Sequence, residues 1–365
     1  MLNAQKYIEI VKSRGERKRP LNRVFRMIRH RDLFLAAYSK LYANNGATTA
    51  GTNPEDTVDG MSLNRIDRIR GQLAAGTFRW TPVKRIYIDK KQGGKRPLGL
   101  PGWNDKLVQE VLRMLLEAYY EPQFADSSHG FRPGRGCHTA LEAIRRQWRG
   151  TTWFIEGDIE GCFDNIDHTV LMDIIERDIH DQRLSKLLRD MLEAGYMEEW
   201  RHHRTYSGTV QGGVISPLLA NIVLNELDQF VENTLIPRYT RGKKRRGNPE
   251  YHRLSWEMTK ARKCRDKATY QRLERQRQQI PSGDPYDDNF RRLRYCRYAD
   301  DFILGFIGPK REAETIKAEI AAFLATLKLT LSPEKTLITH AVNSRARFLG
   351  YELHVVRNDH CLTYH

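Results

Sequence analysis

The sequence is poor in cysteine and contains no long apolar run. Its 365 residues include five cysteines, Cys137, Cys162, Cys264, Cys296 and Cys361. They are widely spaced, odd in number and form no Cys-x-x-Cys pair or Cys/His cluster, which argues against a disulfide framework or a zinc module and favours a reducing compartment. No segment approaches the length of a membrane span, and the first twenty residues lack the apolar core of a signal peptide. We therefore expect a cytoplasmic protein without membrane contact.

Acidic residues are fewer than basic residues. The chain has 61 Lys and Arg against 45 Asp and Glu, which gives a formal net charge of +16. Residues 238–278 alone hold fifteen basic and four acidic residues, and so account for eleven of these charges. Such an excess predicts a polyanionic partner, with a basic surface that merely keeps the protein soluble as the alternative.

The basic residues concentrate in a segment, 236–292, that reads as a helical insertion. It opens with the Gly-flanked cluster "GKKRRG", and its apolar content is too thin for a core of its own, so we expect it to lie on a larger domain. Tyr251, Trp256 and Tyr270 are interspersed among the cations, a pattern typical of phosphate contact combined with base stacking. A solvated loop is the alternative.

The rest of the chain alternates strand-like and helix-like stretches, which predicts an α+β fold. Strands are expected in "VKRIYIDKKQGGKRPLGLP", which turns at Gly93–Gly94, and in "TWFIEGDI", "LRYCRYA" and "FILGFIG". Amphipathic helices are expected at 62–75, 105–124, 137–148 and 310–327, and after His168 and Pro217.

Two adjacent aspartates, Asp300 and Asp301, lie between two of these strands, which places them best at the turn of a β-hairpin. Two carboxylates this close repel each other unless a cation lies between them. Asp158 follows another strand, and antiparallel pairing would bring it beside the pair. Three carboxylates at one sheet edge suit two Mg²⁺ ions that hold the attacking and leaving oxygens of a phosphoryl transfer. An ordinary Asp-bearing turn is the alternative, and either Asp164 or Asp167 is expected to cap the helix that begins near His168 rather than bind metal.

Eight stretches, in their order along the chain, resemble the reverse transcriptases encoded by group II introns, the maturases, in particular those of the lactococcal type. They are "NNGATTAGTNPEDTVDG", "KRIYIDKKQGGKRPLGLP", "SSHGFRPGRGCHTAL", "WFIEGDIEGCFDNIDH", "TYSGTVQGGVISPLLANIVLNELD", "RYADDFILG", "LSPEKTLITH" and "RFLGYEL". The resemblance implies a right-hand polymerase with fingers and palm, an antiparallel palm sheet packed on helices, and a basic helical insertion. It implies four parts: 1–150, an N-terminal extension and fingers; 151–235, the first part of the palm; 236–292, the insertion; and 293–365, the rest of the palm.

The resemblance also implies roles for single residues. Asp158, Asp300 and Asp301 fall on the family's catalytic, Mg²⁺-binding carboxylates. Phe163 falls on the aromatic gate that favours deoxynucleotides, although a core aromatic is the alternative for it. Nucleotide binding is implied for Lys90, Arg96, Phe163, Gln211, Gly212, Tyr298 and Lys335, the last as a proton donor to pyrophosphate. RNA binding is implied for Arg132, Arg135, Lys243, Lys244, Arg245, Arg246, Lys260, Arg262 and Lys263.

The function implied is that of an RNA-directed DNA polymerase that binds its group II intron RNA in a ribonucleoprotein and assists splicing and mobility. Its other partners would be an RNA template with a DNA primer, dNTPs, and target DNA reached through regions absent from this chain. Family members continue past "FLGYEL" into a thumb and DNA-binding regions, so we expect a fingers and palm portion. An RNA-binding splicing cofactor without polymerase activity and a retron-type reverse transcriptase are the alternatives. The oligomeric state stays open, a homodimer included.

Overall fold

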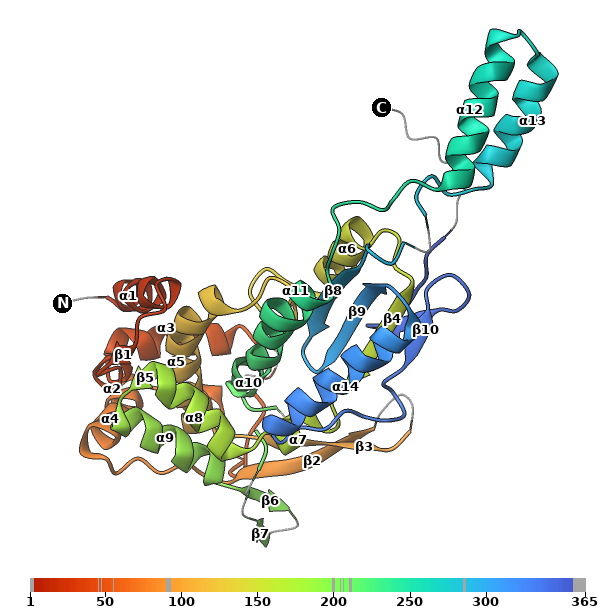
Figure 1. Ribbon diagram of the computed structural model, residues 1–365. Helices are drawn as coiled ribbons and strands as arrows, with labels where there is room; N and C mark the ends of the chain where they lie inside the picture. The colour runs from red at the N-terminus through yellow and green to blue at the C-terminus, as the bar shows by residue number, and fades with distance from the viewer. Residues whose placement is uncertain are drawn as a thin grey trace.

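Helices form one side of the molecule and a four-stranded sheet the other, with a helical hairpin projecting beyond the sheet (Figure 1). The computed structural model describes residues 3–44, 46, 48–54, 56–89, 93–198, 201–203, 205, 207–209, 212–284 and 287–356. The α+β class and the fingers and palm arrangement predicted from the sequence are confirmed.

The helical side is built around α5 (Trp103–Tyr120), which is buried along most of its length. The helices α1 (Ala4–Glu16) and α3 (Arg31–Tyr42) pack against it, and α4 (Leu63–Ala75) packs against α3. Local signals fix the ends of α4: the Ser62 side chain accepts a hydrogen bond from the Arg65 amide, and Gly76 closes the helix in the left-handed conformation, with φ 72°.

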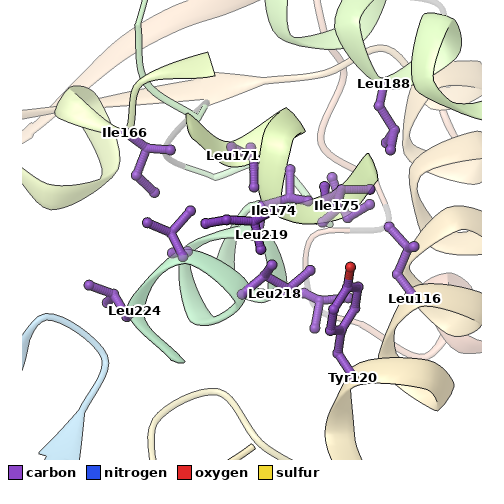
Figure 2. Packing of buried hydrophobic residues seen from close by; sticks show 14 of the residues in the cluster. Leu116, Tyr120, Ile166, Leu171, Ile174, Ile175, Leu188, Leu218, Leu219 and Leu224 are labelled. Atoms are coloured by element: carbon purple, nitrogen blue, oxygen red, sulfur yellow. The ribbon is translucent and has the colours of Figure 1, made fainter. Parts of the chain in front are cut away.

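The core joins this helical side to the middle of the chain. In Figure 2, side chains from α5, α8 (His168–Asp178), α9 (Gln182–Glu193) and α10 (Ser216–Phe230) meet in one cluster. The labelled members are Leu116, Tyr120, Ile166, Leu171, Ile174, Ile175, Leu188, Leu218, Leu219 and Leu224. The Asp167 side chain accepts from the Val170 amide and so caps α8, as predicted.

The predicted hairpin near residue 90 is present as β2 (Val83–Asp89) and β3 (Lys95–Leu100), which pair antiparallel. Gly93 and Gly94 precede β3 with φ of 88° and 81°, a conformation that glycine adopts without strain. Two further strands, β6 (Tyr196–Glu198) and β7 (Arg201–His203), extend this sheet, although the sequence did not predict them.

The palm sheet has the strand order β10-β4-β9-β8 and is antiparallel throughout. Its strands are β4 (Trp153–Asp158), β8 (Arg292–Tyr298), β9 (Asp301–Ile307) and β10 (Ile338–His340). Alternate residues of a strand face opposite sides. Phe302 and Leu304 accordingly join the main core with α10 and α14 (Lys310–Thr326), whereas Ile303 joins a second cluster with α6 (Cys137–Gln147).

The basic insertion folds as a pair of helices, α12 (Pro249–Lys263) and α13 (Lys267–Gln278), that project from the palm (Figure 1). Leu254, Met258 and Leu273 form a small buried cluster between the two helices. The expectation that this segment lacks a core of its own was therefore wrong. Three apolar side chains are enough here because two helices only need to bury the seam between them.

The remaining elements are short. They are β1 (Leu21–Asn22), α2 (Phe25–Ile28), η1 (Val58–Gly60), η2 (Glu121–Gln123), α7 (Cys162–Asn165), β5 (Ile179–His180), η3 (Val231–Leu235), α11 (Ile236–Arg238), β11 (Ala346–Phe348) and β12 (Tyr351–Leu353). Within the described ranges no helix has both the length and the apolar character needed to cross a membrane. The four cysteines that lie in these ranges are free thiols.

Candidate active site

Three aspartates meet at one end of β4 and β9, the two inner strands of the palm sheet. Asp158 is the last residue of β4 and pairs in register with Asp301, the first residue of β9. Asp300 lies in the tight turn between β8 and β9, directly after Ala299, whose φ is 56°. The predicted hairpin and the predicted position of Asp158 beside it are both confirmed.

Burial and neighbouring carboxylate charges raise the pKa of Asp300 and of Asp301. Burial, followed by the charges of Asp300 and Asp158, raises the pKa of Asp301 from 3.8 to about 7. Burial also raises the pKa of Asp300, and the Asp158 charge adds to this rise, whereas Arg96 and Lys335 oppose it. The site thus holds more negative charge than its surroundings stabilise, which is the condition in which a bound cation is favourable.

The donor chemistry fits a hard divalent cation. Carboxylate oxygens are the ligands that such ions prefer. As the side chains stand, however, no group of three or more His, Cys, Asp or Glu residues in the described part of the chain is arranged around a metal position. Instead, Lys335 Nζ lies 2.9 Å from Asp158 Oδ2, and this hydrogen bond raises the pKa of Lys335. The residues therefore fit a divalent ion that would replace Lys335 at Asp158.

A buried arginine, Arg297, holds the turn between β8 and β9 in place through hydrogen bonds. The fully buried Arg297 side chain donates to both carboxylate oxygens of Asp228 at 2.7 and 2.6 Å, to Asn221 Oδ1 at 3.0 Å and to Ser128 Oγ at 2.8 Å. It also donates to the Ala299 carbonyl oxygen at 2.8 Å, which fixes the residue before Asp300. Arg297 is not among the predicted site residues, although its place on the same strand face as the buried Leu293 and Tyr295 was the available signal.

The loop before α6 packs against the same turn. A Cβ atom on Gly130 would lie 2.3 Å from the Ala299 backbone nitrogen, so only glycine fits. Arg132 is buried, pairs with Glu121, and donates to the backbone oxygens of Ala125 at 2.5 Å and Ser128 at 2.8 Å. A guanidinium enclosed in this way does not reach a phosphate. The prediction of Arg132 as an RNA contact is therefore wrong, and its role is to hold the loop.

Several predicted nucleotide-binding residues surround the aspartates. Tyr298 pairs with Asp301 across the hairpin, and Arg96 on β3 is exposed and close enough to lower the pKa of Asp300. Phe163 is half-buried on α7 (Cys162–Asn165). The thiol of Cys162, the residue before it, has its pKa raised to about 12, mainly by burial and then by the Asp300 charge.

The three other predicted nucleotide-binding residues are Gly212, Lys90 and Gln211, of which the structure describes only Gly212. Gly212 has φ 103°, and a Cβ there would lie 2.8 Å from the Gly99 carbonyl oxygen. Lys90 and Gln211 lie outside the described residues.

The predicted RNA-binding cations of the insertion lie on α12 or in the segment that leads to it. The α12–α13 hairpin (Figure 1) adjoins the start of β8, whereas the aspartates lie at the far end of that strand. Lys260, on α12, lies over the exposed ring of Trp256, 3.6 Å from its centroid. The other exposed cations of this set are Lys243, Lys244, Arg246, Arg262 and Lys263. Arg245 is half-buried against Phe290, Arg246 pairs with Asp284, and Arg135, near the palm, pairs with Asp126.

Residues 88–353 match the family described as reverse transcriptase (RNA-dependent DNA polymerase). The chain belongs to the reverse transcriptase family. The match includes all three aspartates, and members of this family use divalent metal ions.

Relatives of this reverse transcriptase include proteins encoded by introns. The chain is 45% identical over 345 residues to the group II intron-encoded protein LtrA of Lactococcus lactis subsp. cremoris, covering 92% of this chain and 57% of that protein. It is 43% identical to an uncharacterized 91 kDa protein in the cob intron of Schizosaccharomyces pombe (90% of this chain, 41% of that protein) and 34% identical to protein YkfC of Escherichia coli (91% and 83%). The predicted resemblance to group II intron-encoded proteins is confirmed, and this chain spans little more than half of LtrA's length.

Proposed function

We propose that this chain acts as an RNA-directed DNA polymerase of a group II intron and also binds the intron RNA. The observation that carries the proposal is the meeting of Asp158, Asp300 and Asp301 at one sheet edge in a member of the reverse transcriptase family. A module that only bound RNA would have no use for half-buried, mutually repelling carboxylates facing a polyanion.

The three aspartates would hold Mg²⁺. When bound, the metal would lower the pKa of a primer 3′-hydroxyl and neutralise the charge that develops on the pyrophosphate. Lys335, released from Asp158, would then have its ammonium group free beside the site, where it would donate a proton to the leaving pyrophosphate.

The substrates would be dNTPs on an RNA template with a DNA primer. Phe163 would present its ring to the 2′ carbon of the incoming sugar, leaving no room for a hydroxyl group. Arg96 supplies an exposed guanidinium near Asp300, where it would bind triphosphate oxygens.

Intron RNA would bind to the projecting α12–α13 hairpin. Lys260, Arg262 and Lys263 are exposed near the end of α12, and Trp256 offers a face on which a base would stack. The distance of this hairpin from the aspartates favours a second candidate function, an RNA-binding splicing cofactor that works without polymerase chemistry. In either case the protein would work within a ribonucleoprotein.

Primer extension on poly(rA)/oligo(dT) with Mg²⁺ tests the proposal. We expect the chain to incorporate dTTP far better than UTP, and the Asp300→Asn variant to lose this activity. Tight, salt-sensitive binding to the intron RNA without any incorporation would instead favour the splicing cofactor.

A further inference from the structure

Phe131, in the loop before α6, combines two unfavourable features. Its φ is 55°, a left-handed conformation that is rare for a bulky aromatic residue, and its side chain is 54% exposed. A strained backbone that presents an apolar ring to solvent persists only where its surroundings hold it in place, and such residues concentrate at functional sites.

The loop is fixed on both sides of Phe131. Before it, Gly130 packs against the Ala299 backbone, and its carbonyl oxygen accepts a 2.8 Å hydrogen bond from Asn221 Nδ2. After it, Arg132 is enclosed by Glu121 and by backbone oxygens of the same loop. The strained residue is therefore held at a set position relative to Ala299 and the neighbouring Asp300.

The Phe131 ring lies against Phe163. The two ring centroids are 6.2 Å apart and the ring planes meet at 84°, the edge-to-face geometry that aromatic pairs favour. The Phe163 backbone is itself held, because its carbonyl oxygen accepts a 2.7 Å hydrogen bond from the Thr209 amide. The Phe163 side chain also packs against the main hydrophobic core, and the Phe131 ring adds a second contact that limits its rotation.

We propose that Phe131 is a positioning residue that sets the orientation of the Phe163 ring and thereby determines how strictly the site rejects ribonucleotides. This inference rests on the proposed polymerase function, in which Phe163 faces the sugar. Without the Phe131 ring, Phe163 turns away from the sugar more easily and leaves room for a 2′-hydroxyl. Phe131 acts through Phe163 and does not itself touch the nucleotide.

The test compares kcat/KM for dTTP and UTP on poly(rA)/oligo(dT) with Mg²⁺ in Phe131→Gly, Phe131→Ala and Phe131→Tyr. Glycine tolerates the left-handed conformation, so Phe131→Gly removes the ring without adding strain, whereas Phe131→Ala removes the ring and keeps the strain. We expect both to lower the dTTP/UTP preference by about threefold to tenfold, mainly because UTP is used better, in keeping with the usual strength of an edge-to-face pair. Phe131→Tyr, which keeps the ring, should keep the preference.

A double-variant cycle separates positioning from direct contact. In a Phe163→Val background, which already lacks the aromatic gate, Phe131→Gly should change the preference no further. An unchanged preference in Phe131→Gly, an equal loss of dTTP and UTP use, or a full additional effect in the Phe163→Val background would each overturn the inference while leaving the polymerase function intact. A wild-type chain that incorporates no dTTP would overturn the proposed function, and the inference with it.

Discussion

Lys335 Nζ lies 2.9 Å from Asp158 Oδ2, so the lysine ammonium group forms an ion pair with a carboxylate that is proposed to bind metal. A lysine in this position competes with a divalent cation for the same oxygen. The same lysine is proposed to act later as a proton donor, and the two roles predict opposite effects when it is replaced.

We predict that Lys335→Met increases the affinity of the free chain for Mg²⁺ and lowers the polymerisation rate. Removing the competing charge favours the cation, whereas removing the donor slows the step that releases pyrophosphate. Mg²⁺ affinity would be measured as the rise in Tm with metal concentration, and the rate by single-turnover extension. Lys328→Met is the matched control. Lys328 Nζ lies 2.8 Å from Asp167 Oδ2, in a similar ion pair that includes none of the three aspartates. A similar gain in Mg²⁺ affinity in both variants would contradict the prediction.

The raised pKa of Asp301 leads us to predict that the stability of the chain depends on pH. This pKa is raised to about 7 in the folded chain, so between about pH 4 and pH 7 the folded state binds more protons than the unfolded state. The free energy of unfolding in metal-free buffer should therefore fall as the pH rises through this range and level off above it. Asp301→Asn should make this slope shallower, leaving the contribution of Asp300, and raise the Tm at pH 8 by roughly 1–2 °C for each kcal/mol gained.

Asp167→Asn serves as a control of opposite sign. Lys328 and the Val170 amide lower the pKa of Asp167, so its contribution to stability is present at neutral pH and is lost as the pH falls through the lowered value. Asp167→Asn should therefore destabilise the chain at pH 7. Thermal melting between pH 4 and pH 8 measures both variants, and a wild-type slope retained in Asp301→Asn would count against the assignment.

Breaking the buried Arg297–Asp228 pair should be costly. Arg297→Met leaves Asp228 as an unpaired buried charge, and this class of change destabilises proteins by about 3–5 kcal/mol. The double variant Arg297→Met/Asp228→Leu removes both charges and should recover part of the loss. Urea denaturation measures both. We expect the double variant to remain a poor polymerase, because the Ala299 carbonyl oxygen still lacks the hydrogen bond that fixes the turn.

The cations of α12 should bind RNA largely through phosphates. Replacing Lys260 and Lys263 by alanine should weaken binding of intron RNA and lower the slope of log affinity against log salt by about 1.5–2, roughly one unit for each lost phosphate contact. Lys186→Ala/Lys310→Ala, which removes the same charge from α9 and α14, is the control. Salt-dependent filter binding distinguishes the two, and equal slopes in both double variants would argue against a hairpin contact.

The sequence predicted the parts of the site that depend on local pattern. The apolar runs on either side of Asp300 and Asp301 define a hairpin, and period-two alternation then brings Asp158 opposite Asp301. The support beneath the turn was not predictable in this way. Arg297 meets Asp228 across 69 positions of sequence, and no local pattern reveals which charge a buried arginine will find.

Arg132 also shows that local sequence does not reveal the partners of a charged residue. In "GFRPGRG" it has the local pattern of a phosphate-binding residue, since glycine and proline often hold a guanidinium in an exposed loop. Its burial is decided by Glu121, eleven residues earlier, and by two carbonyl oxygens that only the folded loop brings within reach. Charge in a loop thus indicates either a ligand contact or a clamp, and only the packing distinguishes the two.

The projecting hairpin leaves and rejoins the palm at one place. Arg241 and Arg291 exchange backbone hydrogen bonds of 3.1 and 3.0 Å, and Gly247 pairs with Gly283 further out. Since the two ends of the excursion are already neighbours, a tight turn between Arg241 and Arg291 would close the chain without moving a palm strand, and loop length costs little free energy. The excursion can therefore be lengthened, replaced or removed without disturbing the end of the palm sheet that carries the three aspartates.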